Sequence, residues 1–246
     1  DPQREMSYAE LRAETDAVAN GLAALGVEPG DHVALFLPNL TTFVTSYYGA
    51  MKLGAIPVPI NLRFGEAEIA HVLRDVAPSA LVVLDRFVDA FADRDLGVEL
   101  VAVGDEDIEG TTDYGQLVAD AEKSFHTAER LDSQVAEILY TSGTTGDPKG
   151  VQHTHGNLAA NARGGARHMH MTSDTVYLTI APCFHATGLN GTTSPSVVTG
   201  AETHLLPGRR PGMALRTMES RGTRATVLIS PEDVDPIDNG PGGCPS

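Results

Sequence analysis

Short apolar runs alternate with segments of helical periodicity through most of this 246-residue sequence. Of all the features of the sequence, this alternation places the strongest constraint on the fold. Each run is long enough for one strand, and the strands of parallel sheets have this near-continuous apolar character. Helices between successive strands are the usual crossover connections of such sheets. We therefore predict an α/β fold in which mostly parallel sheets carry helices on both faces. The expected strands cover residues 31–37, 56–60, 80–84 and 99–103.

Turn and cap residues set the expected ends of these elements. Ser7 and Glu10 have the spacing of a capping box, so a first helix should begin there and end before Gly26. Pro57 and Pro59 cannot donate ladder hydrogen bonds, which makes their strand brief or places it at an edge. A second helix should run through Val44 and Met51 and end near Gly54. The other expected helices cover residues 66–76, 86–92 and 114–123, an acidic loop covers 104–113, and strand, loop and helix repeat through 135–229.

Acidic residues outnumber basic ones, which narrows the function classes. The chain has 33 Asp and Glu against 17 Lys and Arg, a formal net charge of −16. Such a chain repels phosphate backbones and anionic lipid, so nucleic acid and membrane surfaces are poor partners. No apolar run approaches the roughly 18 residues of a membrane span. Two Cys residues cannot build a disulfide framework, and we expect a reducing, cytoplasmic location.

The negative charge is concentrated in the first half of the chain. Residues 1–132 hold 24 acids and 9 bases, whereas residues 133–246 hold 9 and 8. One interpretation is an ordinary solvated acidic face. The other is a halophilic protein adapted to concentrated salt, where screening shortens the reach of like-charge repulsion. The presence of only 3 lysines among the basic residues favours this second interpretation, and both stay open.

The densest chemical signal is the segment ILYTSGTTGDPKGV at residues 138–151. An apolar strand leads into a loop of glycines and hydroxyls, followed by Lys149 and a second short strand. Glycines let backbone N–H groups approach an anion, hydroxyls donate to phosphate oxygens, and Lys149 adds positive charge. Pro148 precedes Lys149 and Gly150 follows it, so this is not a Walker loop. We interpret the segment as a triphosphate or pyrophosphate site rather than a flexible surface turn.

This segment resembles the signature phosphate loop of the adenylate-forming superfamily, which includes acyl-CoA synthetases, peptide-synthetase adenylation domains and luciferases. Three further stretches resemble motifs of that superfamily in the same order: MSYAEL at 6–11, KLGAIPVPIN at 52–61 and APCFHATG at 181–188. The resemblance covers about residues 6–229. It implies that residues 1–229 form a partial large N-terminal domain of the adenylate-forming fold.

The resemblance also implies a carboxylate–CoA ligase, similar to fatty-acid–CoA ligases. Such an enzyme joins a small-molecule carboxylic acid to ATP and then passes the acyl group to coenzyme A. The implied phosphate-binding residues are Thr141, Ser142, Gly143, Thr144, Thr145, Gly146 and Lys149. Thr141 also matches a position that helps to hold Mg²⁺, although a lone hydroxyl is a weak magnesium site. His185 matches the family histidine near the substrate carboxylate and is the implied catalytic residue.

Several residues near these motifs have plainer interpretations. A histidine satisfied in a buried turn is the alternative for His185, but its place in the motif favours the functional role. Cys183 is expected to pack rather than react, because no supporting base is identifiable. Asn157 is a candidate N-cap for the helix after the loop. A zinc site is disfavoured because no Cys or acid cluster completes a ligand set for two histidine pairs and one single histidine: His153 with His155, His168 with His170, and His204.

After residue 229 the chain departs from the family pattern. The family continues into an adenine-binding segment, a ribose-binding Asp and a small C-terminal domain with a catalytic Lys, and we find none of these. Residues 230–246 hold 4 Pro and 3 Gly, which predicts a disordered or frameshifted tail. We expect the isolated chain to be an inactive, incomplete ligase that associates through unpaired sheet edges. The alternatives are a non-catalytic nucleotide-binding module and one half of a split enzyme.

Overall fold

The computed structural model describes residues 4–92, 97–141, 146–207, 211–223 and 225–226, and the structural statements below concern these residues. Its largest element is a five-stranded sheet with strand order β2-β1-β3-β4-β5, in which all neighbouring strands are parallel. The strands are β1 (His32–Phe36), β2 (Ile56–Pro59), β3 (Ala80–Leu84), β4 (Glu99–Val103) and β5 (Thr112–Asp113). The predicted parallel sheet is confirmed, and β2 lies at its edge, where its prolines are tolerated.

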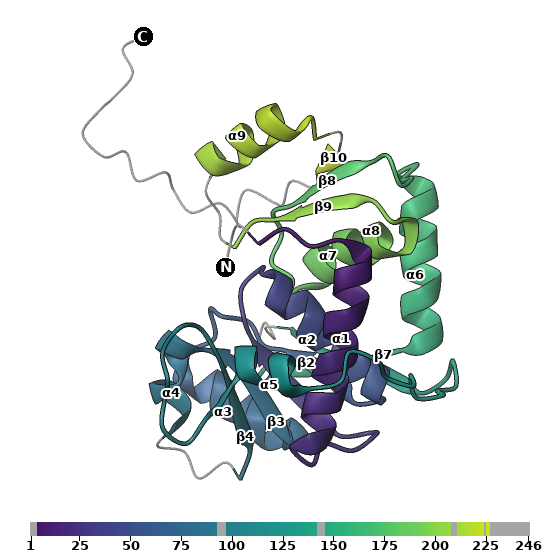
Figure 1. The fold of residues 1–246 in the computed structure, drawn as a ribbon. Coiled ribbons are helices and arrows are strands. Elements are labelled where there is room, and N and C mark those ends of the chain that lie inside the picture. Colours follow the sequence, from purple (N-terminus) through teal and green to yellow (C-terminus); the bar gives the residue numbers. More distant parts are fainter. Residues whose placement is uncertain (1–3, 93–96, 142–145, 208–210, 224, 227–246) are drawn as a thin grey trace, which may run out of the picture.

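Helices cover both faces of this sheet (Figure 1). Alternate side chains of β1 enter two separate cores, with Val33 and Leu35 in one and Ala34 and Phe36 in the other. Helices α1, α2 and α5 supply side chains to the first core, and α3 and α4 supply the second. The helices are α1 (Tyr8–Ala24), α2 (Thr41–Leu53), α3 (Glu66–Val76), α4 (Asp89–Ala92) and α5 (Tyr114–Asp120), with a 3₁₀ turn (Asp85–Phe87) before α4.

Local signals place the ends of the first two helices as predicted. Ser7 Oγ accepts from the backbone N–H of Glu10, whose Oε2 accepts in return from the backbone N–H of Ser7, at 3.2 and 2.7 Å. Gly54 ends α2 with a φ of 86°, a left-handed conformation that favours glycine. The acidic stretch before α5 differs from expectation, because residues 112–113 pair with β4 instead of remaining in a loop.

The chain then forms an antiparallel pair, β6 (Val135–Thr141) and β7 (Lys149–Thr154), and continues directly into α6 (His155–His168). The N-cap of α6 is Thr154, whose Oγ1 accepts from the backbone N–H of Asn157 at 3.2 Å. The prediction that Asn157 is the N-cap is therefore wrong. The backbone is already helical at His155, and Asn157 lies at the third helical position, where it donates to the cap.

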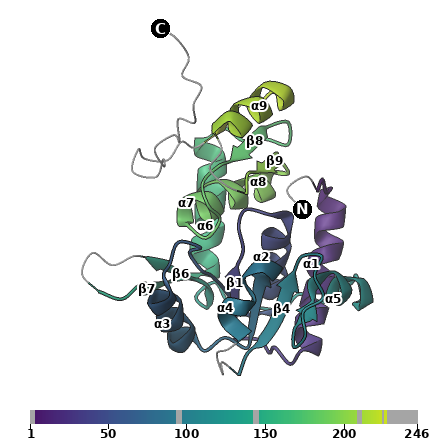
Figure 2. The same ribbon diagram turned by 90° about the vertical axis from the view of Figure 1, so that its left-hand side faces the viewer.

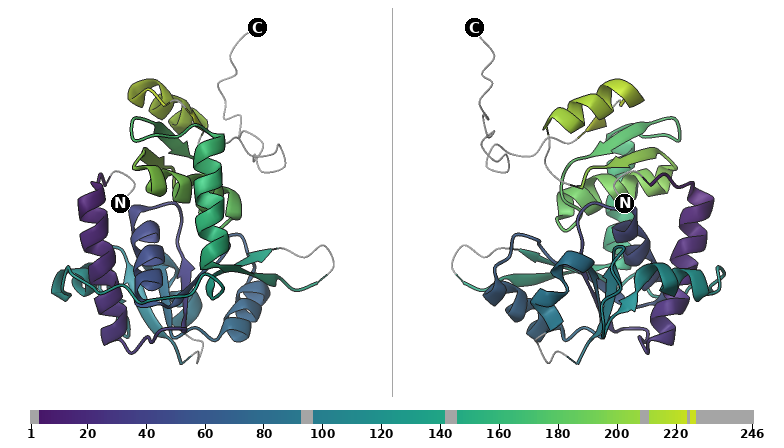
Figure 3. Two further views of the ribbon diagram at one scale, coloured as in Figure 1. Left: turned by 90° about the vertical axis from the view of Figure 1, so that its right-hand side faces the viewer. Right: turned by 60° about the vertical axis from the view of Figure 1, so that its left-hand side comes forward.

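A smaller parallel sheet has strand order β10-β8-β9. Figures 2 and 3 show α8 and α9 on opposite sides of this sheet and α6 running from the β6–β7 pair towards it. Its elements are β8 (Val176–Thr179), α7 (Ala186–Gly188), the π-helical segment η2 (Leu189–Thr193), α8 (Ser194–Thr199), β9 (Glu202–Leu205), α9 (Pro211–Arg221) and β10 (Ala225–Thr226). In the part of the chain that the structure describes, no helix is long and apolar enough to cross a membrane. The predicted tail at 230–246 lies outside the described residues.

Candidate functional site

The β6–β7 hairpin brings together the two ends of the predicted phosphate loop. Thr141 is the last residue of β6, Lys149 is the first of β7, and the two are register partners. Both are exposed, as is Gly146, so a polyphosphate can reach them from solvent. The hairpin projects beyond the five-stranded sheet (Figure 2). The remaining predicted loop residues lie outside the described residues: Ser142, Gly143, Thr144 and Thr145.

Helix α3 contacts the loop end of this hairpin at two points. The Nε2 atom of His71 lies 3.0 Å from the backbone oxygen of Pro148, and Nδ1 lies 3.9 Å from Oδ2 of Asp147. Tyr140 donates its hydroxyl to Asp75. Burial and the neighbouring Asp75 carboxylate both raise the pKa of Tyr140, so its phenol remains a donor. The position of Lys149 is thereby tied to a helix packed on the main sheet.

The segment that carries His185 makes a tight turn after β8. His185 is half-buried at the residue before α7, and its ring packs against Phe184 with centroids 4.9 Å apart. Its backbone N–H donates to the oxygen of Pro182 at 3.0 Å. A Cβ atom at Gly188 would lie 2.2 Å from that same oxygen, so only glycine fits there. The close approach of the Pro182 oxygen is therefore a steric reason for the glycine that ends this motif.

Asn39, which follows β1, fixes the start of this turn. Its Oδ1 accepts from the backbone N–H of Cys183 at 2.6 Å, and its Nδ2 donates to the oxygen of Ala181 at 2.8 Å. The thiol of Cys183 is fully buried in the core, and burial raises its pKa to about 12. These observations support the prediction that Cys183 packs rather than reacts, because the nucleophilic thiolate is disfavoured.

Glu137 joins the hairpin to the His185 segment and was missed at the sequence level. Its side chain is fully buried on β6. Oε2 accepts from the hydroxyl of Tyr47 at 2.8 Å, and Oε1 lies 2.8 Å from Nδ1 of His153 and 2.5 Å from Nδ2 of Asn190. A single acid within an otherwise apolar strand was the signal that could have identified it, because buried carboxylates require hydrogen-bond partners.

The described residues contain no group of three or more His, Cys, Asp or Glu that could hold a metal ion. His153 contacts Glu137, and His204 contacts Glu202 at 2.8 Å. Thr141 offers one exposed hydroxyl oxygen. This fits a Mg²⁺ ion only where phosphate oxygens and water supply the other ligands. Lys149, the register partner of Thr141, places a positively charged side chain opposite that hydroxyl.

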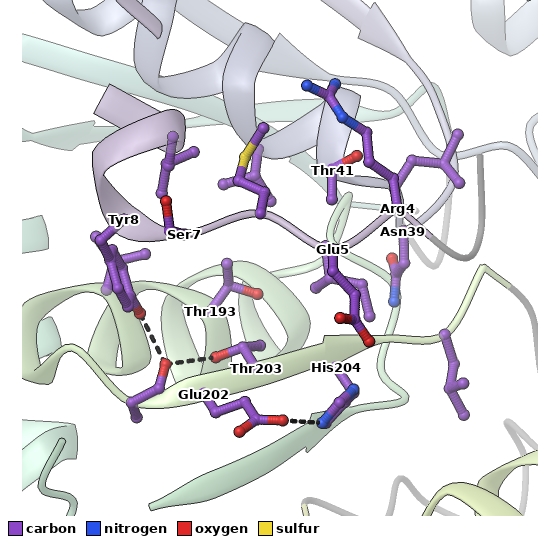
Figure 4. Close-up of a pocket in the computed structure, with 18 of the residues that line it drawn as sticks. Arg4, Glu5, Ser7, Tyr8, Asn39, Thr41, Thr193, Glu202, Thr203 and His204 are labelled. Carbon is purple, nitrogen blue, oxygen red and sulfur yellow. Dashed lines mark hydrogen bonds and ion pairs between the residues drawn. The ribbon is translucent and has the colours of Figure 1, made fainter. Parts of the chain in front are cut away.

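A separate cavity of about 900 Å³ lies between the start of α1, the β1–α2 turn, β9 and α9 (Figure 4). Tyr8 closes one end, donating its hydroxyl to the backbone oxygen of Ala201 at 2.8 Å. None of Thr141, Gly146, Lys149 and His185 lines this cavity. The predicted site and this cavity therefore occupy different places in the described structure.

Named proteins and a protein family match this chain over nearly its whole length. The family described as AMP-binding enzyme matches residues 1–231. The indoleacetate–CoA ligase of Aromatoleum aromaticum is 35% identical over 236 residues, which cover 93% of this chain and 45% of that protein. The feruloyl-CoA synthase of an Amycolatopsis species is 34% identical over 224 residues, which cover 91% of this chain and 43% of that protein.

Solved structures agree with the family match. The anthranilate CoA ligase AuaEII in complex with anthranoyl-AMP has a TM-score of 0.87 at 27% identity, covering 92% of this chain and 45% of that chain. ATP-bound MatB from Rhodopseudomonas palustris has a TM-score of 0.80 at 29% identity, covering 88% and 43%. The chain spans less than half the length of these relatives. Since the family model matches residues 1–231 and the relatives align over nearly the whole chain, this chain belongs to the AMP-binding enzyme family.

Proposed function

We propose that this chain supplies the phosphate-binding and carboxylate-binding part of an ATP-dependent carboxylate–CoA ligase. The observation that carries the proposal is the hairpin in which Thr141 and Lys149 face each other across the ends of a loop rich in glycine and hydroxyl groups. The names of the relatives, which are CoA ligases and a CoA synthase, support the same reaction class. The substrate is proposed only as a small-molecule carboxylic acid.

The proposed reaction has two steps. A carboxylate oxygen of the acid attacks the α-phosphorus of ATP, the bond from that phosphorus to the bridging oxygen breaks, and pyrophosphate leaves with the electron pair. The thiol of coenzyme A, losing its proton, then displaces AMP from the acyl carbon. Lys149 and the loop donors hold the phosphates in position, and His185 orients the acid. Mg²⁺, when bound with ATP, neutralises phosphate charge.

Binding of ATP tests the hairpin directly. We expect titration calorimetry with Mg·ATP to show binding by the chain and a loss of about tenfold in affinity for Lys149→Ala, because a fixed positive charge is removed from the phosphates. Lys123→Ala is the matched control, since Lys123 is exposed away from the hairpin. Equal affinities for both variants, or no binding by the parent chain, would contradict the proposal.

Pyrophosphate exchange tests how much of the reaction the chain performs. Because the chain spans less than half the length of its relatives, we propose that it binds ATP without completing adenylation alone. Robust exchange by the isolated chain with a panel of carboxylic acids would refute that part. Exchange that appears only after addition of a second polypeptide would identify one half of a split enzyme. Binding without exchange under every condition would leave a nucleotide-binding module.

A further inference from the structure

Glu137 occupies an unusual place, because its fully buried carboxylate is shared by three other elements of the fold. Tyr47 lies on α2, His153 on β7 and Asn190 on η2, and each contacts one of its two oxygens. An ionised carboxylate is strongly disfavoured in an apolar interior unless donors surround it. The described contacts provide three, so Glu137 can remain an acceptor for all of them.

The contact with His153 lies within the β6–β7 hairpin, which is called the phosphate hairpin below because its ends flank the predicted phosphate loop. Glu137 and His153 are register partners, and so are Thr141 and Lys149 four positions further along the same two strands. Side chains an even number of residues apart lie on one face of a strand, and cross-strand partners share that face. Glu137 therefore lies on the same face of the hairpin as Thr141 and Lys149, four residues further from the loop.

The contact with the Glu137 carboxylate indicates which nitrogen of His153 carries a hydrogen. A carboxylate has no hydrogen to give, so Nδ1 of His153 carries the hydrogen of this contact. The His153 side chain is 28% exposed, whereas the Glu137 side chain has no exposed surface. Glu202 and His204 form a pair of the same length on β9, but that acid is 55% exposed. The Glu137–His153 pair differs from the Glu202–His204 pair because its acid is fully buried.

The contact with Asn190 connects Glu137 to the segment that follows the His185 turn. Asn190 is 93% buried, and its backbone oxygen accepts from Nδ2 of Asn161 on α6 at 2.8 Å. Thr192 and Thr193 both donate to the oxygen of Gly188, which holds the π-helical segment closed. Within the described part of the chain, Oδ1 of Asn190 has no hydrogen-bond partner, so the amide is oriented by its bond to Glu137.

We propose that Glu137 is a positioning residue that sets the orientation of the phosphate hairpin relative to the His185 turn, through Asn190. The functional meaning of this orientation rests on the proposed function, since it would align ATP with the acid. The hydrogen bond from Tyr47 to Glu137 has a different role. It anchors the same carboxylate to α2 and does not join the two binding segments.

Two variants separate positioning from simple support of the core. Asn190→Ala removes the link between the hairpin and the turn, whereas Tyr47→Phe removes only the bond to α2. Both partners are buried and both lose one hydrogen bond to the same carboxylate. A merely structural role for Glu137 predicts the same local behaviour in the two variants.

The measurement is the distance distribution between spin labels on Val151→Cys and Ala186→Cys, recorded by pulsed electron resonance without ligand. Both positions are exposed, and Cys244→Ser leaves only the buried Cys183, which does not label. We expect Asn190→Ala to broaden the distribution about twofold and Tyr47→Phe to leave it unchanged. Equal widths in the two variants, narrow or broad, would overturn the proposal.

The experiment also includes a milder substitution at Asn190 and a kinetic measurement with ATP. If Asn190→Ala does not fold, Asn190→Ser shortens the same donor and is expected to give the same broadening. Because the spin-label result needs no nucleotide, failure of the chain to bind ATP would refute the proposed function and leave the positioning test standing. Where a complementing polypeptide restores exchange, Asn190→Ala is expected to lower kcat about tenfold with little change in KM for ATP. A loss confined to KM would count against the proposal.

Discussion

Replacement of Asn39 by Ala tests how the His185 turn is held. The Asn39 side chain is 4% exposed and satisfies two backbone groups, the N–H of Cys183 and the oxygen of Ala181. Ala181 and Cys183 are 1% and 0% exposed, so water does not reach these groups in the folded chain. Truncation leaves one donor and one acceptor buried without a partner.

The expected loss follows from these two groups. Each buried polar group without a partner costs about 1–3 kcal/mol, so the loss of two partners in Asn39→Ala should lower the free energy of unfolding by roughly 2–6 kcal/mol. A chain of this size should have a urea dependence of about 3 kcal/mol per molar, because the slope rises with the surface exposed on unfolding, so the midpoint should fall by roughly 1–2 M. The cost comes from desolvated backbone groups rather than from lost apolar contact.

Asn20→Ala is a matched control. Nδ2 of Asn20 also donates to two distant backbone oxygens, those of Glu122 and Ser124 at 2.8 and 3.0 Å, but this site is exposed. Water can replace the amide there, so the loss should stay below about 1 kcal/mol. Urea unfolding followed by circular dichroism measures both variants. If Asn39→Ala costs no more than Asn20→Ala, burial of the Asn39 site does not control its energy and the reasoning is refuted.

Three further predictions concern the cap of α6, the buried thiol of Cys183 and the half-buried phenol of Tyr48. Thr154→Ala should lower the free energy of unfolding by about 1 kcal/mol while Asn157→Ala changes it by a few tenths, and the reverse order in urea melts would contradict the observed cap. In a Cys244→Ser background, Cys183 should react with Ellman's reagent at pH 8 only after unfolding, because burial raises its pKa to about 12; fast reaction of the native chain would show an open thiol. Burial raises the pKa of Tyr48 to about 12, so the stability contributed by its neutral phenol is complete below about pH 10 and is lost as the pH rises towards about 12. Phenolate absorbance at 295 nm should therefore rise together with unfolding, and ordinary titration of that phenol near pH 10 in a folded chain would contradict the burial.

The parts of the fold that could be predicted depend on neighbouring residues. The capping box at Ser7 and the glycine at Gly54 act through contacts within a few positions, so their helix ends are readable in sequence. The β5 strand is different, because its two residues pair with β4 only after the sheet has formed. Thr154 and Asn157 are both good cap residues, and tertiary context decides between them.

The candidate site divides in the same way. The loop ends at Thr141 and Lys149 and the turn at His185 belong to contiguous motifs, which the sequence displays directly. Asn39 and Glu137 act on residues far away in the chain, as Asn39 is separated by 142 positions from Ala181. No periodicity or spacing rule connects such residues, because their meeting depends on the packing of two sheets.

The contacts of Glu137 also order the events of folding. The β6–β7 hairpin pairs within 20 residues of chain and can close early, since loop closure over a short distance is cheap in entropy. Tyr47 is 90 positions before Glu137, and Asn190 is 53 positions after it. During synthesis the carboxylate can therefore meet Tyr47 first and must wait for Asn190 to leave the ribosome. The last of these bonds to form is the one that reaches the His185 turn, so a chain arrested before residue 190 would carry a paired hairpin with an unfinished binding site.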